Sequence, residues 1–191
     1  MSKAVLISIK PKWCEKIING DKTIEVRKTR PKMNTPFKCY IYCTLPKYPH
    51  EDFIATNYPR PQFYGGGKVI GEFTCDRIDW ITHIGYTGIP NLVETRICDA
   101  ATMRTSPVGG LLNAACLMPK MLNDYLAQGD GYGWHITDLR IYDAPKCLFE
   151  FWAERLCRRE PSVFGCGECC DCDKRAPQSW CYVEEVRDEH C

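Results

Sequence analysis

The chain has 191 residues, of which 45% are hydrophobic, 26% charged and 12% aromatic, and its formal net charge is +1. This length fits one domain with an extension, or two small domains, and the near-zero charge excludes a global field that would attract nucleic acid. The opening MSKAVLISIKPKW turns charged too soon for a signal peptide, and no apolar run is long enough to span a membrane. We therefore expect a globular protein of the cytoplasm.

Cysteine is unusually frequent, with 14 residues in the chain. In the reducing cytoplasm thiols are more often free or metal-bound than paired, although a secreted, disulfide-bonded protein is an alternative. The cysteines in apolar strand or helix patterns are expected in the core: Cys14, Cys39, Cys43, Cys75, Cys98 and Cys147.

Alternation and turn residues predict the elements of the first half of the chain. In order, these are a strand at 4–10, a helix at 11–22, strands at 23–28 and 37–44, a long loop at 46–67 and a strand at 68–79. Pro11 suits the first turn of the helix, and Gly20 provides its C-terminal stop. Gly71, inside a strand pattern, indicates a bulge or a close approach of another chain segment.

The second half is less regular. Residues 80–117 have no clear pattern, and short helices are plausible there. Pro119 and Gly129 bound a helix expected at 119–131. A strand is expected at 132–143, with a bulge where its apolar phase switches near Thr137, and residues 146–152 are expected to close the core.

These elements amount to about six short strands with two or three helices in the first ~150 residues. The pattern indicates an α+β fold, namely a small antiparallel or mixed β-barrel with flanking helices. The composition changes after Trp152, where aliphatic residues become scarce and half of the cysteines are concentrated. We therefore expect a domain at 1–152 and a Cys-rich extension at 153–191.

The extension contains the repeat C-x2-C-x2-C. Thiolates at this spacing, with Gly165 and Gly167 supplying permissive backbone, suit a tetrahedral zinc ion. Such a site would supply folding energy to a segment too poor in aliphatics to pack alone, so its role would be structural. The expected ligands are Cys157, Cys166, Cys169 and Cys172, with Cys170 and Cys181 as substitutes. An iron–sulfur cluster, free thiols and disulfides are the alternatives.

The stretch GDKTIEVRK, residues 20–28, begins a local basic patch on this otherwise neutral chain. Between residues 22 and 38 one acid, Glu25, accompanies six basic residues: Lys22, Arg27, Lys28, Arg30, Lys32 and Lys38. Such a patch can contact phosphates. A solvated edge strand protected by its charges would have the same pattern.

The combination of a strand, a helix and then G-x-K-x-x-E-x-R (Gly20, Lys22, Glu25, Arg27) resembles the ASCH domain of the PUA-like superfamily. KVIGEF (68–73) resembles the central strand of that barrel, and YGWHITDLRIYDAPKCLFEF (132–151) resembles its closing strand pair. RAPQSWCYVEE (175–185) resembles the tail of ASCH proteins from bacteria and their phages. The resemblance covers nearly the whole chain, and residues 80–117 match it least.

The resemblance implies a cleft beside the first helix that binds RNA, a nucleotide or a nucleoside. Thr23, Glu25 and Arg27 would face this cleft, with Lys22 at its lip. An arginine fork suits a phosphate or a base edge, and a glutamate can accept from an exocyclic amine.

Three residues of the later strand complete the expected ligand site. Tyr132 and Trp134 could stack on a base, and His135 could donate or accept a hydrogen bond. Trp134 could equally be a core residue, since aromatics fill barrel interiors. His135 could equally be a partly buried histidine with one satisfied nitrogen.

A second implied function is that of a small amidohydrolase acting on a modified nucleoside such as N4-acetylcytidine. The resemblance implies that such ASCH-like enzymes use a catalytic constellation of a lysine, a threonine and a glutamate. Lys22 matches the lysine, Glu25 stands where the threonine is expected, and the stretch 113–120, where the glutamate is expected, contains no acid. Lys22 and Glu25 are catalytic candidates only on this alternative, and Cys116 is either a helix N-terminal thiol of lowered pKa or a small buried residue.

Overall fold

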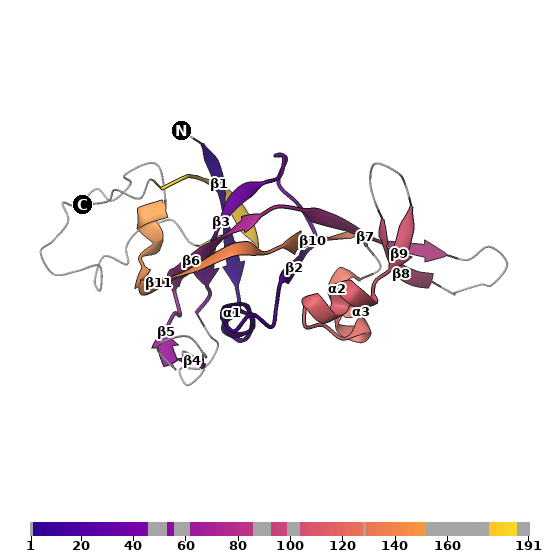
Figure 1. Ribbon diagram of the computed structural model, residues 1–191, viewed down its shortest axis with the longest axis horizontal. Helices are drawn as coiled ribbons and strands as arrows, with labels where there is room; N and C mark the ends of the chain where they lie inside the picture. The colour runs from indigo at the N-terminus through magenta and orange to yellow at the C-terminus, as the bar shows by residue number, and fades with distance from the viewer. Residues whose placement is uncertain are drawn as a thin grey trace, which may run out of the picture. The chain divides into compact units, whose positions relative to one another are not determined.

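The structure is a computed structural model that describes residues 2–45, 53–55, 62–85, 93–98, 104–127, 129–151 and 176–186 (Figure 1). The chain divides into two compact units, each assembled from separate stretches of sequence. Unit 1 comprises Met1–Glu15, Lys38–Phe73 and Leu139–Cys191, and unit 2 comprises Lys16–Phe37 and Thr74–Asp138.

Sheet A has the strand order β11-β6-β3-β1-β12 and supplies the core of unit 1. Its strands are β1 (Lys3–Ile9), β3 (Phe37–Cys43), β6 (Lys68–Cys75), β11 (Thr137–Lys146) and β12 (Trp180–Glu184). Val5 of β1 pairs with Cys39 in the parallel direction and with Tyr182 in the antiparallel direction. Leu6 and Tyr40, which are paired across β1 and β3, belong to one buried cluster with Phe151, and both strands are buried along nearly their whole length.

Two helices and a small hairpin accompany these strands. Helix α1 (Pro11–Ile18) follows β1 directly, and the 3-10 turn η2 (Leu148–Phe151) carries the buried Phe151. Strands β4 (Phe53–Ala55) and β5 (Gln62–Tyr64) pair with each other inside the segment predicted as a loop.

Sheet B has the strand order β2-β10-β7-β8-β9 and forms unit 2 with helices α2 (Gly109–Ala114) and α3 (Pro119–Leu126). Its strands are β2 (Ile24–Arg27), β7 (Ile78–Gly85), β8 (Val93–Cys98), β9 (Thr105–Pro107) and β10 (Gly131–His135). Ile24 and Val26 pack with Leu111 and Leu122 from the two helices. A Cβ on Gly133 would lie 2.8 Å from Leu111, so glycine is needed where the helix approaches β10.

The predicted α+β class is confirmed, with eleven strands among the described residues up to 151, where about six were expected, and a twelfth at Trp180–Glu184. The stretch 68–79 breaks after Cys75, and 80–117 contains the end of β7 with β8, β9 and α2. No sheet closes on itself within the described residues; sheet A ends at β11 and β12, and sheet B at β2 and β9. The sequence underestimates the number of strands because the strands of sheet B are short and have weak alternation.

Two boundaries differ from the prediction for reasons of backbone conformation. Helix α3 ends at Leu126 because Ala127 takes the left-handed conformation, with φ 52°, before Gly129 is reached. The phase switch near Thr137 is a break between β10 and β11 rather than a bulge, and Asp138 has φ 48°. Gly71 confirms the predicted close approach, since its Cβ would lie 2.5 Å from the carbonyl oxygen of Arg140.

Five of the six cysteines expected in the core are buried. The exception is Cys147, which is half-buried with its Sγ 3.1 Å from the Lys68 ammonium. Part of the predicted extension also has a place in the fold, because β12 pairs with β1 along its whole length. None of the helices in the described residues has the length and apolar character needed to cross a membrane.

Candidate functional site

The turn after α1 places the first residue of the site. Gly20 has φ 79°, a conformation that favours glycine, and its N–H donates to the carbonyl of Ile17 at 3.0 Å. The Lys22 N–H then donates to the carbonyl of Lys16 at 3.0 Å. The chain therefore reverses tightly, and β2 begins two residues after Lys22.

Lys22, Glu25 and Arg27 form a buried array of alternating charge. Their exposed fractions are 3%, 7% and 8%. The Lys22 Nζ lies 3.3 Å from Glu25 Oε2, and the Arg27 Nη2 lies 3.1 Å from Glu25 Oε1. Each carboxylate oxygen of Glu25 thus faces a different cation. Charges this buried are rarely kept unless they are paired, and the pairing here is complete for Glu25.

Lys22 is also anchored to the backbone on both sides of the array. Its Nζ donates to the carbonyl oxygens of Ile24 and Ala115, each at 2.8 Å. With Glu25, these provide three acceptors, and an ammonium has three hydrogens. The expected position of Lys22 at an open lip is therefore wrong, since the side chain is an internal connection between β2 and the end of α2.

The neighbouring strand β10 adds two aromatics to the same face of sheet B. Trp134 lies opposite Glu25, and Tyr132 lies opposite Arg27 in the antiparallel register. Directly opposed residues share a face, so the array and both aromatics lie together. Trp134 is fully buried and packs edge to face on Phe37 at 5.9 Å, which fits the core interpretation, whereas Tyr132 is only partly buried.

Beyond the array, exposed cations continue along the segment after β2. The guanidinium of Arg30 lies 5.8 Å from the ring centre of Tyr132. The ammonium of Lys28 lies 5.3 Å from the ring centre of Tyr125 on α3. Tyr125 is 40% exposed, and Lys28 and Arg30 are exposed as well. The basic patch predicted from the sequence therefore includes two surface cation–aromatic pairs.

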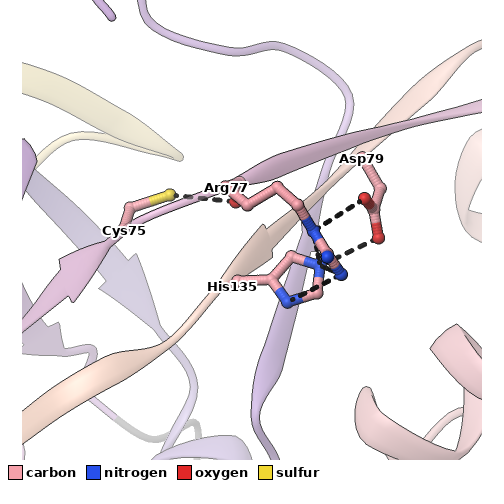
Figure 2. A network of polar contacts seen from close by, with 4 residues as sticks. All are labelled: Cys75, Arg77, Asp79 and His135. Carbon is pink, nitrogen blue, oxygen red and sulfur yellow. Dashed lines mark hydrogen bonds and ion pairs between the residues drawn. The ribbon is translucent and has the colours of Figure 1, made fainter. Parts of the chain in front are cut away.

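His135 belongs to a different cluster, because alternation along β10 turns it to the face opposite Tyr132 and Trp134. Its Nε2 lies 2.8 Å from Asp79 Oδ2, and the Arg77 Nε lies 3.3 Å from Asp79 Oδ1. Figure 2 shows the Arg77 guanidinium lying against the imidazole and beside the carboxylate. This arrangement fits the interpretation of His135 as a partly buried histidine with a satisfied nitrogen.

The same nitrogen of His135 has two competing neighbours. Arg77 Nη2 approaches Nε2 at 2.9 Å, but Nε2 cannot accept from a guanidinium while it donates to Asp79. The thiol of Cys75 is close in sequence and donates to the carbonyl of Arg77 at 3.5 Å (Figure 2). Burial raises the pKa of Cys75 to about 12, so this thiol is neutral near pH 7 and is no candidate nucleophile.

The remaining predicted residues fall into separate places. Thr23 is exposed, and its backbone joins Ala114 and Ile136 by hydrogen bonds of 2.8 and 2.9 Å. Cys116 follows α2 with φ 53° and is only partly buried, so it is neither a helix N-terminal thiol nor a core residue; its Sγ donates to the carbonyl of Asp21 at 3.2 Å.

The predicted zinc ligands Cys157, Cys166, Cys169 and Cys172 lie outside the described residues. Among the residues that are described, no group of three or more His, Cys, Asp or Glu side chains could hold a metal ion. The zinc site therefore stays a prediction from the spacing.

Sequence reasoning missed three residues of these clusters: Arg77, Asp79 and Tyr125. Tyr125 had a usable signal, since the apolar stripe of α3 requires Leu122 and Leu126 inside and leaves Tyr125 outside. No signal in the sequence pointed to Arg77 and Asp79, because the break between β6 and β7 and the pairing of β7 with β10 depend on contacts distant in sequence.

The fold defined by these two units is that of ASCH proteins, as solved structures show. No family model matches the sequence, and no curated protein matches it. Similar solved structures include crystal structures of the ASCH protein from Zymomonas mobilis, and the fold-level resemblance inferred from the sequence is thereby confirmed.

Three of these structures align over nearly the whole chain. A tyrosine-to-phenylalanine variant is 17% identical, with a TM-score of 0.53 and coverage of 96% of this chain and 92% of that one. A second crystal structure of the Zymomonas mobilis ASCH protein is 18% identical, with a TM-score of 0.51 and coverage of 97% of this chain and 89% of that one. A serine-to-alanine variant is 18% identical, with a TM-score of 0.52 and coverage of 95% and 89%.

Proposed function

We propose that this chain is an ASCH-type domain that binds RNA or a nucleotide on the face of sheet B formed by β2 and β10. A base would stack on Tyr132, with Arg30 contacting a phosphate or the exposed side of the base. Arg27, opposite Tyr132 on the neighbouring strand, and Glu25, opposite Trp134, would provide the hydrogen-bonding edge. The observation that carries this proposal is the Arg30–Tyr132 pair beside the ordered charges of Arg27 and Glu25.

The chemistry of these groups supports a nucleotide over other small ligands. Aromatic rings and guanidinium planes both stack on bases, and each exposed cation adds phosphate affinity. Arg27 and Glu25 present one donor fork and one acceptor held in fixed positions by their mutual ion pair at 3.1 Å. The protein's net charge of +1 contributes little, so the attraction would come from this patch.

The alternative of a nucleoside amidohydrolase has less support from the geometry. A catalytic Lys22 would need a hydrogen or a lone pair directed at the substrate. Its Nζ instead has acceptors in Ile24, Ala115 and Glu25, all within 3.3 Å. Lys22 therefore suits a role in holding Glu25 and the end of α2 in place.

Fluorescence anisotropy with a labelled single-stranded RNA tests the proposal. Tyr132→Ala should weaken binding about 5- to 150-fold, the usual loss when one stacking platform is removed. Arg30→Gln should weaken binding and lower the slope of log affinity against log salt by about 0.7 to 1, because one phosphate contact is lost.

Unit 1 provides matched controls for both substitutions. Tyr182 is 42% exposed, and the Lys3 ammonium lies 5.8 Å from its ring centre. Tyr182→Ala and Lys3→Gln therefore remove the same chemistry from a different surface and should leave the RNA affinity unchanged. If the Tyr132 and Arg30 variants bind as the controls do, the proposed face is not the binding site.

A further inference from the structure

We propose that Trp80 of β7 is a second base-stacking residue beside Tyr132, so that this face of sheet B takes two successive bases of one single-stranded RNA. The inference rests on the proposed function and extends its site from β2 and β10 onto β7. It implies that an oligonucleotide binds more tightly than an isolated nucleotide, because the second base has a ring of its own.

The strand register places Trp80 directly beside Tyr132. Strand β10 lies between β2 and β7, and Tyr132 is opposed by Arg27 on one side and by Trp80 on the other. Directly opposed residues point to the same face of a sheet, with their Cβ atoms about 5 Å apart. Asp79 and Ile81, the neighbours of Trp80 along β7, point to the other face, where Ile81 joins the core with α2 and α3. The two rings therefore share the face opposite to the helices.

Tyr132 and Trp80 are the accessible members of a row that crosses four strands. The row runs from Arg27 on β2 through these two rings to Cys98 on β8. Arg27 and Cys98 are 8% and 5% exposed, whereas both aromatics are only partly buried. Arg30 lies 5.8 Å from the ring centre of Tyr132, so a positive charge marks one end of the accessible pair. An RNA with a phosphate at Arg30 and a base on Tyr132 would place its next base over Trp80.

The indole of Trp80 has a feature that packing alone does not explain. Its Nε1 is buried and has no hydrogen-bond acceptor among the described residues. An unsatisfied buried donor costs stability, and a phenylalanine would supply an aromatic ring without that cost. Such departures from what stability favours are expected at functional sites. The tryptophan is therefore better explained by a ligand than by the fold.

Trp80→Leu, which removes the aromatic ring and keeps an apolar side chain, tests the inference on the full chain. Fluorescence anisotropy compares a labelled mixed-sequence RNA of about eight nucleotides with the four nucleoside monophosphates as competitors. We expect Trp80→Leu to lower the RNA affinity about 5- to 150-fold and to leave the mononucleotide affinity largely unchanged, so that their ratio falls. Tyr132→Ala should weaken both ligands, because a mononucleotide occupies the position at Tyr132 and Arg30.

Two further variants separate stacking from folding. Trp80→Phe keeps a ring and removes the unsatisfied N–H, so it should retain most of the RNA affinity and change the urea unfolding midpoint little. Trp180→Leu is the matched control in unit 1, because Trp180 is also partly buried and its ring centre lies 5.4 Å from that of Tyr182. It should leave the RNA affinity unchanged.

Tryptophan fluorescence reports the position of Trp80 directly. A base stacked on an indole quenches its emission, so RNA should quench the unmodified chain more than it quenches Trp80→Phe. Equal quenching of the two proteins would place Trp80 away from the bound bases and disprove the second position, even if Trp80→Leu does not fold.

The outcomes distinguish this inference from the function on which it rests. If Tyr132→Ala weakens both ligands but Trp80→Leu leaves the ratio unchanged, the second position is disproved and the first survives. If neither the RNA nor any mononucleotide binds the unmodified chain, the proposed function fails and the inference with it.

Discussion

At the residue scale, the central feature is a single buried carboxylate held between two cations. Glu25 contacts Lys22 on one oxygen and Arg27 on the other, and all three side chains are at most 10% exposed. In such an arrangement the pair need not stabilise the fold more than apolar residues would, but removing one partner leaves a buried charge uncompensated. The array is therefore sensitive to substitution at its centre.

Glu25→Ala should lower the free energy of unfolding by about 3–5 kcal/mol, because Lys22 and Arg27 would both lose their counter-charge in a buried place. Glu25→Gln should cost less, since the amide oxygen still accepts one hydrogen bond. Urea unfolding followed by tryptophan fluorescence measures both.

The matched control is an exposed pair on α3. Lys120 and Asp124 lie 2.7 Å apart with side chains 82% and 65% exposed, so Asp124→Ala should change stability by no more than about 0.5 kcal/mol. Equal effects of Glu25→Ala and Asp124→Ala would show that the array is solvated rather than buried.

At the element scale, two features hold sheet A together at its opposite ends. At one end β6 approaches β11 through Gly71, whose Cβ would lie 2.5 Å from the carbonyl oxygen of Arg140. At the other end β12 pairs with β1 and is followed by Glu185, which accepts from Ser2 and lies 3.3 Å from Lys38. Lys38 also lies 3.5 Å from Glu72, so one lysine connects β12 with β6.

Gly71→Ala should destabilise the protein by about 1–3 kcal/mol, because a methyl group at 2.5 Å from a backbone oxygen forces β6 and β11 apart. Gly110→Ala in α2 is the control: nothing lies within 4 Å of its Cβ position, and alanine suits a helix better than glycine. Thermal unfolding compares the two. A neutral Gly71→Ala would mean that the strands do not pack as closely as described.

The loss of stability at acid pH should depend on the ionisation of Glu185. The hydrogen bond from Ser2 and the charge of Lys38 hold the pKa of Glu185 below its ordinary value of 4.5, although burial opposes them. A group with a lowered folded-state pKa contributes stability that is present above its ordinary pKa and is lost as the pH falls through the folded value. As the pH is lowered from 7, the free energy of unfolding should therefore fall less steeply in Glu185→Gln than in the unmodified chain.

Ser2→Ala provides the second variant, since it removes the largest cause of that shift. It should give part of the same effect. At the alkaline end, burial alone would lower the pKa of Lys38, but Glu72 and Glu185 outweigh it and raise the value above 10.5. The stability that Lys38 contributes is thus present below its ordinary pKa of 10.5 and is lost as the pH rises through the higher folded-state pKa. If the unmodified chain, Glu185→Gln and Ser2→Ala lose stability equally as the pH falls, the role given to Glu185 is wrong.

At the scale of the whole molecule, the sequence predicted the local features better than the distant pairings. The strands β1, β2 and β3, the stop at Gly20 and the close approach at Gly71 were readable because each depends on nearby residues. The position of His135 was not, because its face depends on where β10 ends and on pairing with β7. The burial of Lys22 was also hidden, since its second carbonyl partner is Ala115, far along the chain.

The Cys-rich extension leads to a separate prediction for the intact chain. If C-x2-C-x2-C holds zinc with Cys157, native mass spectrometry of the purified protein should show one zinc ion that is lost on acid denaturation. Cys166→Ser combined with Cys169→Ser should abolish that mass, and Cys147→Ser, outside the repeat, should keep it. A bare-chain mass for the unmodified protein would rule out the metal.

The most direct test of the central claim is an NMR titration of the labelled full-length chain with a short single-stranded RNA. We expect amide shifts to concentrate at residues 25–30 and 131–134. Shifts confined to sheet A, or to the cluster of Arg77, Asp79 and His135, would contradict the assignment of the β2–β10 face as the binding site.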